Sequence, residues 1–219
     1  MTIKDFYNHY WQKRGESKGT RLRYQIFLDW IKPNSKVLDI GGGDGFLAEM
    51  LTKEKNCQVT VMDISEEALT MAVKRGLEVR VGNAEENLPF KDKSFDWVIM
   101  SEILEHIAAA EKALAEAIRI AKDGVLVSVP NTGYLKYRLQ LLFGRFPKQW
   151  LFNPKEHLRF WTLRDFKKLV KDLSLEIVKI KASAGRRWLR DLWPSLLAEQ
   201  LCYKLKISSS VKTLEGRKD

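Results

Sequence analysis

Cysteine is scarce in this chain: Cys57 and Cys202 are the only two among 219 residues. They lie far apart and form no CxxC pair, so the sequence offers no disulfide framework. No apolar run approaches the roughly 20 residues that a membrane-spanning helix needs. The first eleven residues are polar and aromatic, without an apolar signal core. Together these absences predict a cytoplasmic protein with reduced thiols.

Acidic residues are unevenly distributed along the chain. Residues 1–130 hold 18 Lys and Arg against 20 Asp and Glu, whereas residues 131–219 hold 20 against 8. The net charge of +10 therefore arises entirely in the C-terminal part. Such a region suits an acidic partner, substrate or surface, although a solvated face with a basic tail is the alternative. Residues 208–219 are polar, and we expect them to form a flexible tail.

Short apolar runs alternate with helical patterns through the first 130 residues. The runs predict five buried strands, at Lys36–Ile40, Gln58–Met62, Leu77–Val81, Phe95–Met100 and Gly124–Val129. Helical spacing between them predicts helices at Gly45–Glu54, from Ser65 to Arg75, and from Ile107 to Ala121. This alternation is typical of a parallel sheet covered by helices on both faces.

The alternation breaks after Pro130. The segment Asn131–Trp161 is rich in aromatic and basic residues, and we interpret it as an α-helical cap inserted over the sheet. Thr162 and Asp165 have the spacing of a capping box and predict a helix ending near Asp172. Two further strands are predicted at Leu175–Ala182 and Leu201–Ile207.

A glycine-rich turn follows the first predicted strand. Asp39, Gly41, Gly43 and Gly45 have D-x-G-x-G-x-G spacing between a strand and a helix. Glycines allow a sharp turn and bring the backbone against a ligand, which then lies at a helix N-terminus. In open α/β sheets, ligands bind beyond the carboxyl ends of the strands.

Two polar residues extend this candidate site. Asp63 ends the second strand, where a carboxylate can accept hydrogen bonds from both hydroxyls of a ribose. Asn83 follows the third strand, where its side chain can meet the exocyclic amine of adenine. Gly43, Gly45 and Ala48 also satisfy the dinucleotide pattern G-x-G-x-x-A, so NAD is the nearest competitor. Asp39 favours a ligand with an ammonium group over NAD, whose fingerprint does not ask for an acid there.

At these residues the chain resembles the class I, seven-stranded S-adenosylmethionine-dependent methyltransferases of the ubiquinone-biosynthesis type. The matching stretches are LDIGGGDGFLAEML, VMDIS and GNAEENLPFKDKSFDWVIMSEILEHI. Beyond the fifth strand, the chain is similar to the MetW-like branch, named for methionine biosynthesis, in SVPNTGYLKYRLQLLFGRFP, EHLRFWTLRDFKKL and LLAEQLCYKL. The resemblance covers roughly residues 36–206.

The resemblance implies a doubly wound, Rossmann-like sheet whose last strand is antiparallel. It also implies S-adenosyl-L-methionine as cofactor and S-adenosyl-L-homocysteine as product. The resemblance further implies the following cofactor-binding residues: Asp39, Gly41, Gly43, Gly45, Asp63, Ile64, Asn83, Ala84, Ser101 and Glu102. The family usually has Asp at position 83, so the adenine contact of Asn83 departs from its pattern.

We expect one methyltransferase domain over residues 1–219. Its parts are an N-terminal helical or lid segment (1–35), a cofactor-binding core (36–130), the cap (131–161), a last helix with C-terminal strands (162–207) and the tail (208–219). The aromatic N-terminal segment can fold over the cofactor, or it can form a helix packed on the sheet edge.

Methyl transfer does not require a particular catalytic residue, because a sulfonium is a good leaving group and positioning of the two reactants alone can suffice. His106 and His157 are candidates for a general base. If residues 102–106 are helical, Glu102 and His106 share a face and can orient one another. Packing for His106 and a backbone-bonded loop position for His157 are the alternatives. No third ligand has matching spacing, so we predict no metal.

The cap is the predicted acceptor site. Aromatic and basic residues there suit an acidic or amphipathic acceptor, and a loop at this edge of a sheet commonly sets specificity. The candidates are Tyr134, Arg138, Arg145, His157 and Arg159, with Lys136, Lys148 and Lys155 as further cations.

Several partners and functions stay open. The chain has no Asn-Pro-Pro-Tyr or Asp-Pro-Pro-Tyr run and no Pro-Cys pair, which disfavours DNA base methylation. A small-molecule acceptor is the first prediction. The MetW-like resemblance implies, as an alternative, a non-catalytic partner of a homoserine O-acetyltransferase that binds the cofactor as a signal. The basic C-terminal part leaves RNA methylation as a further alternative, and a homodimer is also open.

Overall fold

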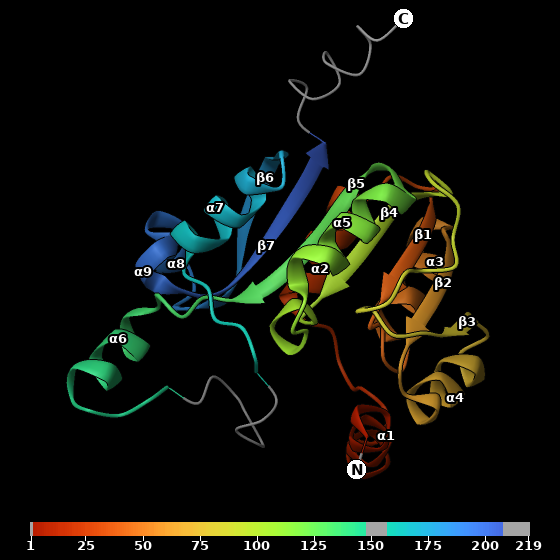
Figure 1. Ribbon diagram of the computed structural model, residues 1–219, viewed down its shortest axis with the longest axis horizontal. Coiled ribbons are helices and arrows are strands. Elements are labelled where there is room, and N and C mark those ends of the chain that lie inside the picture. The colour runs from red at the N-terminus through yellow and green to blue at the C-terminus, as the bar shows by residue number, and fades with distance from the viewer. Residues whose placement is uncertain (1, 148–156, 208–219) are drawn as a thin grey trace, which may run out of the picture.

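A seven-stranded sheet forms the centre of the protein (Figure 1). The structure, a computed structural model, describes residues 2–147 and 157–207. The strands are β1 (Lys36–Ile40), β2 (Gln58–Asp63), β3 (Glu78–Val81), β4 (Phe95–Ser101), β5 (Ala121–Pro130), β6 (Leu175–Gly185) and β7 (Ala198–Ile207). Their order across the sheet is β3-β2-β1-β4-β5-β7-β6. This confirms the predicted doubly wound, seven-stranded fold.

The pairing of the strands places several carboxyl ends at one edge. β1 pairs in parallel with both β2 and β4, and β4 pairs in parallel with β5. β7 lies between β5 and β6 and is antiparallel to both, as the resemblance implied. The residues after β1, β2 and β4 therefore converge at the edge where ligands bind in such sheets.

Helices cover both faces of the sheet. They are α1 (Ile3–Arg14), α2 (Leu22–Trp30), α3 (Phe46–Lys55), α4 (Glu66–Lys74), the 3-10 turn η1 (Leu104–His106), α5 (Ala110–Ile120), α6 (Leu135–Leu142), α7 (Leu163–Asp172), α8 (Leu189–Leu192) and α9 (Pro194–Leu197). One buried cluster joins the sheet to α2, α3 and α4, and another joins it to α5 and α7. Both faces are thus dry, which explains the continuous apolar runs of the strands.

The N-terminal helix α1 lies beyond the carboxyl ends of the parallel strands, beside α4 (Figure 1). A capping box between Thr2 and Asp5 starts it. Its outer side is tied to α4 by an ion pair between Lys4 and Glu66, with 2.6 Å between Nζ and Oε1. Asn8, near the middle of α1, accepts a hydrogen bond at its Oδ1 from the hydroxyl of Ser65 at the start of α4. No helix among residues 2–147 and 157–207 has the length and apolarity to cross a bilayer.

The segment after β5 differs from its prediction. Its described part contains one helix, α6, which projects from the body of the molecule (Figure 1). Tyr137 of α6 is buried, with its hydroxyl donating to Glu199, while Leu141 and Leu142 are exposed. Residues 148–156 of the predicted cap and the predicted tail, 208–219, lie outside the described residues. The short helices α8 and α9 were not predicted.

Candidate active site

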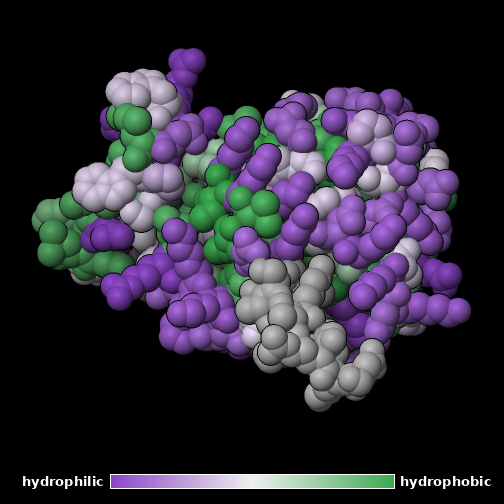
Figure 2. Space-filling view, turned by 90° about the horizontal axis from the view of Figure 1, so that it is seen from above, coloured by the Kyte–Doolittle hydropathy of each residue, from purple (hydrophilic) through white to green (hydrophobic). Residues whose placement is uncertain are grey.

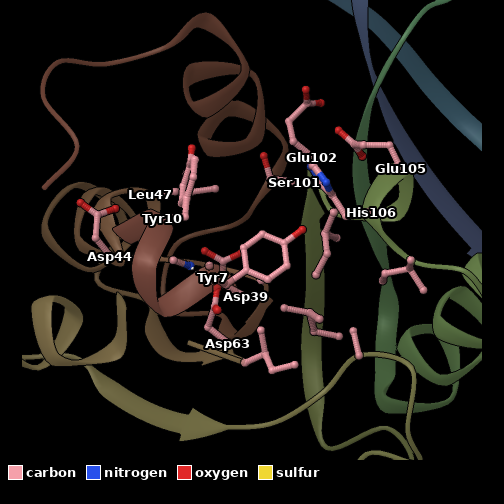
Figure 3. Close-up of a pocket in the computed structure, with 18 of the residues that line it drawn as sticks. Tyr7, Tyr10, Asp39, Asp44, Leu47, Asp63, Ser101, Glu102, Glu105 and His106 are labelled. Carbon is pink, nitrogen blue, oxygen red and sulfur yellow. Dashed lines mark hydrogen bonds between the residues drawn. The ribbon is translucent and has the colours of Figure 1, made fainter. Parts of the chain in front are cut away.

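A cavity of about 1070 Å³ opens where β1, β2 and β4 end. Its walls come from the glycine-rich turn, from α1 and the start of α2, and from β6 and β7. Figure 3 shows Asp39 and Asp63 on one side and Glu105 and His106 on the other, with the Tyr7 ring between them. The cavity therefore has two ends, which we call the glycine-turn end and the acid–histidine end.

The glycine-rich turn is held by backbone hydrogen bonds. The Gly41 amide donates to the Met62 carbonyl at 2.7 Å, and Gly41 and Gly43 have φ of +68° and +59°. A Cβ at Gly43 would lie 2.4 Å from the Trp11 ring, and one at Gly41 would lie 2.3 Å from Ile103 Cδ1. Only glycine fits this conformation and this spacing.

Asp63 closes the turn from β2. One of its oxygens accepts from the Gly43 amide and the other from the Ser65 amide, each at 2.9 Å. Burial raises the pKa of the Asp63 carboxyl, while these backbone donors act in the opposite direction. The carboxyl lies on the cavity wall, and each oxygen has a second lone pair for a hydroxyl.

Asp39 is the most deeply buried acid at the glycine-turn end, with 1% of its surface exposed. Burial raises the pKa of its carboxyl to about 7; the charge of Asp63 adds to the rise, and the Arg23 guanidinium opposes it. Within the described part of the chain, Asp39 Oδ1 has no hydrogen-bond partner. A buried acceptor of this kind, on a cavity wall, fits the ammonium group of a ligand.

The acid–histidine end begins at Glu102, immediately after β4. Glu102 has a left-handed φ of +57°, which is unusual outside glycine. Its carboxylate accepts from Gln200 Nε2 at 2.5 Å, and Gln200 in turn accepts from the Ser183 hydroxyl at 2.6 Å. Strands β6 and β7 thus hold the side chain that leaves β4.

Glu105, His106 and His157 meet at the same end. The imidazole rings lie 4.8 Å apart, and one ligand atom from each of the three residues falls within 4.8 Å of the others. Burial raises the pKa of Glu105 well above its usual range, with Glu102 adding to the rise. Burial, followed by the charge of His106, lowers the pKa of His157 to about 4. At neutral pH the His157 ring is therefore uncharged.

This cluster corrects two inferences from spacing. Glu102 and His106 do not share a helical face, because Glu102 lies outside the short turn η1. The prediction of no metal rested on the lack of a third ligand for Glu102 and His106, whereas the fold places Glu105, His106 and His157, the last from a distant part of the chain, within 4.8 Å of one another. Glu105 Oε2 and His157 Nδ1 have no hydrogen-bond partner among the residues described. The three side chains can hold a cation or exchange a proton.

The predicted cofactor residues nearly all lie on the cavity wall. Those that line it are Asp39, Gly41, Gly43, Asp63, Ile64, Asn83, Ala84, Ser101 and Glu102. Gly45 is the predicted cofactor residue that does not line the cavity. It starts α3 at φ +74°, and a Cβ there would meet Leu77 and Ala72 rather than the cavity. Its role is the turn and the packing of α4.

The predicted acceptor residues are not brought together. His157 lines the cavity, whereas Tyr134, Arg138, Arg145 and Arg159 do not. The Arg138 Nε donates to the Gly133 carbonyl at 2.6 Å, and the Arg159 Nε donates to the Ala108 carbonyl at 3.0 Å. These two guanidiniums therefore bind backbone of this chain. The cations Lys148 and Lys155 lie outside the described residues.

Sequence reasoning missed several residues of the wall. Gln200 and Ser183 enter from β7 and β6, and no motif marks either position. Arg23 enters from α2, buried, and within residues 2–147 and 157–207 its Nε finds no partner. The aromatic run of α1 was a signal, because Tyr7 and Trp11 line the cavity; that α1 acts as a lid over the cofactor stays a prediction.

Comparison with known proteins agrees with this geometry. The family model described as "Methionine biosynthesis protein MetW" matches residues 21–205. The chain belongs to the MetW family. Its sequence is also 27% identical, over 196 residues, to a ubiquinone biosynthesis O-methyltransferase of Azoarcus sp. strain BH72; the match covers 81% of this chain and 82% of that protein.

Two solved structures share the fold. One is the complex between the Haloferax volcanii Trm112 methyltransferase activator and a methyltransferase, with a TM-score of 0.70, 17% identity, and coverage of 94% of this chain and 98% of the other. The second is the magnesium protoporphyrin IX methyltransferase of Synechocystis PCC 6803 with bound SAH, with a TM-score of 0.66, 17% identity, and coverage of 92% and 97%.

Site, fold and family agree on one class. The MetW-family chain has the seven-stranded fold of the class I S-adenosylmethionine-dependent methyltransferases, and the curated proteins it resembles include proteins named as methyltransferases. The residues present fit that cofactor on structural grounds. The glycine turn lines the cavity with its backbone, Asp63 presents a carboxyl to the cavity, and Asp39 offers a buried acceptor that has no partner among the described residues.

Proposed function

We propose that this MetW-family protein transfers a methyl group to a hydroxyl oxygen of a small aromatic acceptor. One observation carries the proposal: a single cavity joins the glycine turn to a cluster of a buried carboxyl and two half-buried imidazoles. Proton removal is needed when the attacking atom arrives protonated, as a hydroxyl does. The similarity to a protein named as an O-methyltransferase supports the same acceptor atom.

The glycine-turn end holds the cofactor in this proposal. Asp63 receives the ribose hydroxyls, and Asp39 receives the ammonium group of the methionine part. Asn83 and Ala84 lie near the adenine, with Ser101 and Glu102 on the methionine side. When bound, S-adenosylmethionine supplies a methyl group on a positively charged sulfur, which is a good leaving group.

The acid–histidine end handles the proton of the acceptor. The neutral His157 ring presents an unpartnered, buried Nδ1, which can accept a hydrogen bond from the acceptor hydroxyl. Glu105 lies within reach of both imidazoles, burial raises its pKa, and its ionised carboxylate can receive the proton. The aromatic rings of Tyr7, Tyr10 and Trp11 give the cavity an apolar wall that suits an aromatic acceptor.

A labelled-methyl assay tests this function. The purified protein is incubated with S-adenosylmethionine carrying a labelled methyl group and with matched phenols, anilines and carboxylic acids. Transfer to the phenols, with the methyl located on oxygen by mass spectrometry, is the expected result. Transfer only to nitrogen or to carboxylates would contradict the proposal, and cofactor binding without any transfer would favour the alternative below.

The family description favours a second candidate function. A protein of methionine biosynthesis that binds the cofactor without using it would act as a sensor and dock on an enzyme such as a homoserine O-acetyltransferase. Capture of that enzyme in a cofactor-dependent way, with no methyl transfer, would establish it. RNA methylation would instead show a steep loss of RNA binding with salt. Sedimentation of the purified protein decides whether it is a homodimer, and cell fractionation checks the expected cytoplasmic location.

A further inference from the structure

Apolar side chains are exposed at the end of the molecule formed by α6 and α8. On α6 and the turn that follows it, the exposed residues are Leu139, Leu141, Leu142, Phe143 and Phe146, and Leu142 and Phe143 reach 74% and 77% exposure. At the two ends of α8 they are Trp188, Leu192 and Trp193. Figure 2 shows apolar side chains at the same end, where Figure 1 places α6 and α8. We call these eight residues the apolar end.

The two parts of the apolar end are joined through α9. The Asn131 side-chain amide, just before α6, donates to the Pro194 carbonyl at 3.2 Å and to the Ala198 carbonyl at 2.7 Å. The Tyr137 hydroxyl donates to Glu199 at 2.6 Å. α9 directly follows α8, so these bonds fix the base of α6 beside it. The apolar end is therefore a continuation of the folded body.

Cations surround the apolar end. Residues 131–147 contain Lys136, Arg138 and Arg145 and no Asp or Glu. Arg186 and Arg187 are exposed just before α8. Exposed Trp, Phe and Leu beside Lys and Arg are the composition with which peripheral proteins enter the headgroup region of a bilayer.

We propose that the apolar end docks this protein on an anionic membrane surface. The most exposed apolar residues, Leu142 and Phe143, lie at the far end of a projecting helix. A soft bilayer accepts such a projection without a matching groove, whereas a protein partner must supply one. The cations supply electrostatic attraction to anionic headgroups.

Docking would bring the cavity to the membrane. Glu199, which accepts from Tyr137, lines the cavity together with Gln200 and Pro130. Helix α6, which carries part of the apolar end, is thus bonded to the cavity wall through Tyr137. An amphipathic molecule in the bilayer would meet this wall at the boundary between lipid and water. The docking itself does not depend on the acceptor proposed above.

Vesicle co-sedimentation tests the proposal. The full chain is mixed with vesicles of phosphatidylcholine containing one third phosphatidylglycerol, and with vesicles of phosphatidylcholine alone. We expect binding to the anionic vesicles at low salt, at least tenfold weaker binding to the neutral ones, and loss of binding at 0.5 M NaCl. The double variant Leu142→Glu/Phe143→Glu should lower the affinity for anionic vesicles at least tenfold.

A matched control keeps the test specific. Val73→Glu/Val178→Glu makes the same charge change at two exposed apolar residues on α4 and β6, with 54% and 41% exposure, and should leave vesicle binding within twofold of the parent. Arg186→Glu/Arg187→Glu should remove the preference for phosphatidylglycerol. Unchanged cofactor affinity in each variant shows that the fold is intact.

Three results would overturn the proposal. One is absence of binding to anionic vesicles by the folded parent chain at low salt. Another is binding that the Leu142→Glu/Phe143→Glu variant leaves untouched. The third is self-association lost in that variant while vesicle binding is absent, because the apolar end would then be an interface between copies. None of these results bears on methyl transfer in solution, so this proposal and the proposed function fail separately.

Discussion

The two ends of the cavity are built in different ways. At the glycine-turn end, consecutive residues from Asp39 to Gly43 shape the wall with their backbone, and Asp63 locks it through backbone amides. At the acid–histidine end, side chains arrive from the exit of β4, from His157 and from β7. The first end is local in sequence, and the second is assembled only by the fold.

This difference also separates their chemistry. Polar groups at the glycine-turn end are largely satisfied within the turn, except Asp39 Oδ1. The acid–histidine end instead keeps Glu102 Oε1, Glu105 Oε2 and His157 Nδ1 without partners in the described part of the chain. Unsatisfied buried groups are costly, and they persist where a ligand or reaction uses them. The glycine-turn end is therefore a binding surface, whereas the acid–histidine end has groups available for proton transfer.

The largest expected effect concerns the acid–histidine end. Glu105→Gln and His157→Gln should each lower the rate of methyl transfer about 100- to 10,000-fold, the range for loss of a general base. Cofactor affinity should stay within twofold, because neither change touches the glycine turn. Rates with the acceptor found in the screen, and calorimetry with S-adenosylhomocysteine, measure the two effects. His9→Gln, on the exposed side of α1, is the control, and equal rate loss there would contradict the assignment.

Next in size is a steric change at the glycine-turn end. Gly43→Ala should weaken cofactor binding more than 100-fold, because the new Cβ has a strained φ and collides with the Trp11 ring. Gly76→Ala imposes the same strain at φ +78°, yet its Cβ meets nothing within 4 Å. Urea unfolding should show a larger loss of stability for Gly43→Ala, whose Cβ alone collides, and only Gly43→Ala should lose the cofactor. Equal cofactor affinity in the two variants would show that the glycine turn is not part of the cofactor site.

A smaller loss is expected for Asp63→Ala. Removing the carboxylate takes away hydrogen bonds to a charged group and should cost about 2–3 kcal/mol, or roughly 30- to 150-fold in cofactor affinity. The control variant Asp96→Ala removes a partly exposed acid elsewhere on the sheet and should leave the cofactor affinity unchanged. Calorimetry on both variants is the measurement, and unchanged affinity in a folded Asp63→Ala protein would place the ribose elsewhere.

The smallest effect is a pH dependence of cofactor affinity. With a pKa of about 7, Asp39 is largely protonated at pH 6 and ionised at pH 8. An ammonium group favours the ionised form, so affinity should rise with pH, by at most about tenfold per unit below pH 7. Calorimetry at pH 6, 7 and 8 measures the rise. The variant Asp39→Asn should bind more weakly and show a flatter profile.

Asp39 also affects the stability of the unliganded protein. This stability should fall as pH rises, whereas the cofactor affinity should rise. The unfolded chain releases the Asp39 proton near the ordinary pKa of 3.8, whereas the folded chain holds it to about 7. The free energy of unfolding should therefore fall as pH rises from about 4 to about 7, and Asp39→Asn should reduce that fall. Urea unfolding at pH 5 and pH 7 compares the two proteins. Identical pH dependence in both would mean that Asp39 ionises as an ordinary acid.

The fold was largely predictable because its signals are local. Neighbouring residues alone determine several elements. Examples are the apolar run of β1, the capping box at Thr162 that starts α7 and the Ser65 cap that starts α4. The glycine turn was predictable for the same reason, since positive φ at Gly41 and Gly43 demands glycine. The exception, Gly45, has the same backbone but faces α4 and β3, and spacing alone does not give that direction.

The acid–histidine end was not predictable because its geometry depends on distant contacts. A left-handed φ at Glu102 breaks the helical spacing that linked it to His106, and nothing in the residue type signals this. The meeting of His157 with His106 requires the chain after β5 to return to η1, where the Leu158 and Arg159 amides donate to the Glu105 carbonyl. Two of the predicted acceptor cations, Arg138 and Arg159, donate instead to backbone carbonyls of this chain, which their spacing in the sequence does not indicate.

The place of β7 in the sheet has a consequence for synthesis. β7 is the last strand in chain order, yet it separates β5 from β6, so β6 has no partner until β7 is made. On a ribosome, the glycine turn and Asp63 can assemble from the first half of the chain, whereas Gln200 reaches Glu102 only when β7 docks. A nascent chain would thus acquire the cofactor half of the cavity first. A stall before β7 would leave the edge of β5 open to pairing with other chains.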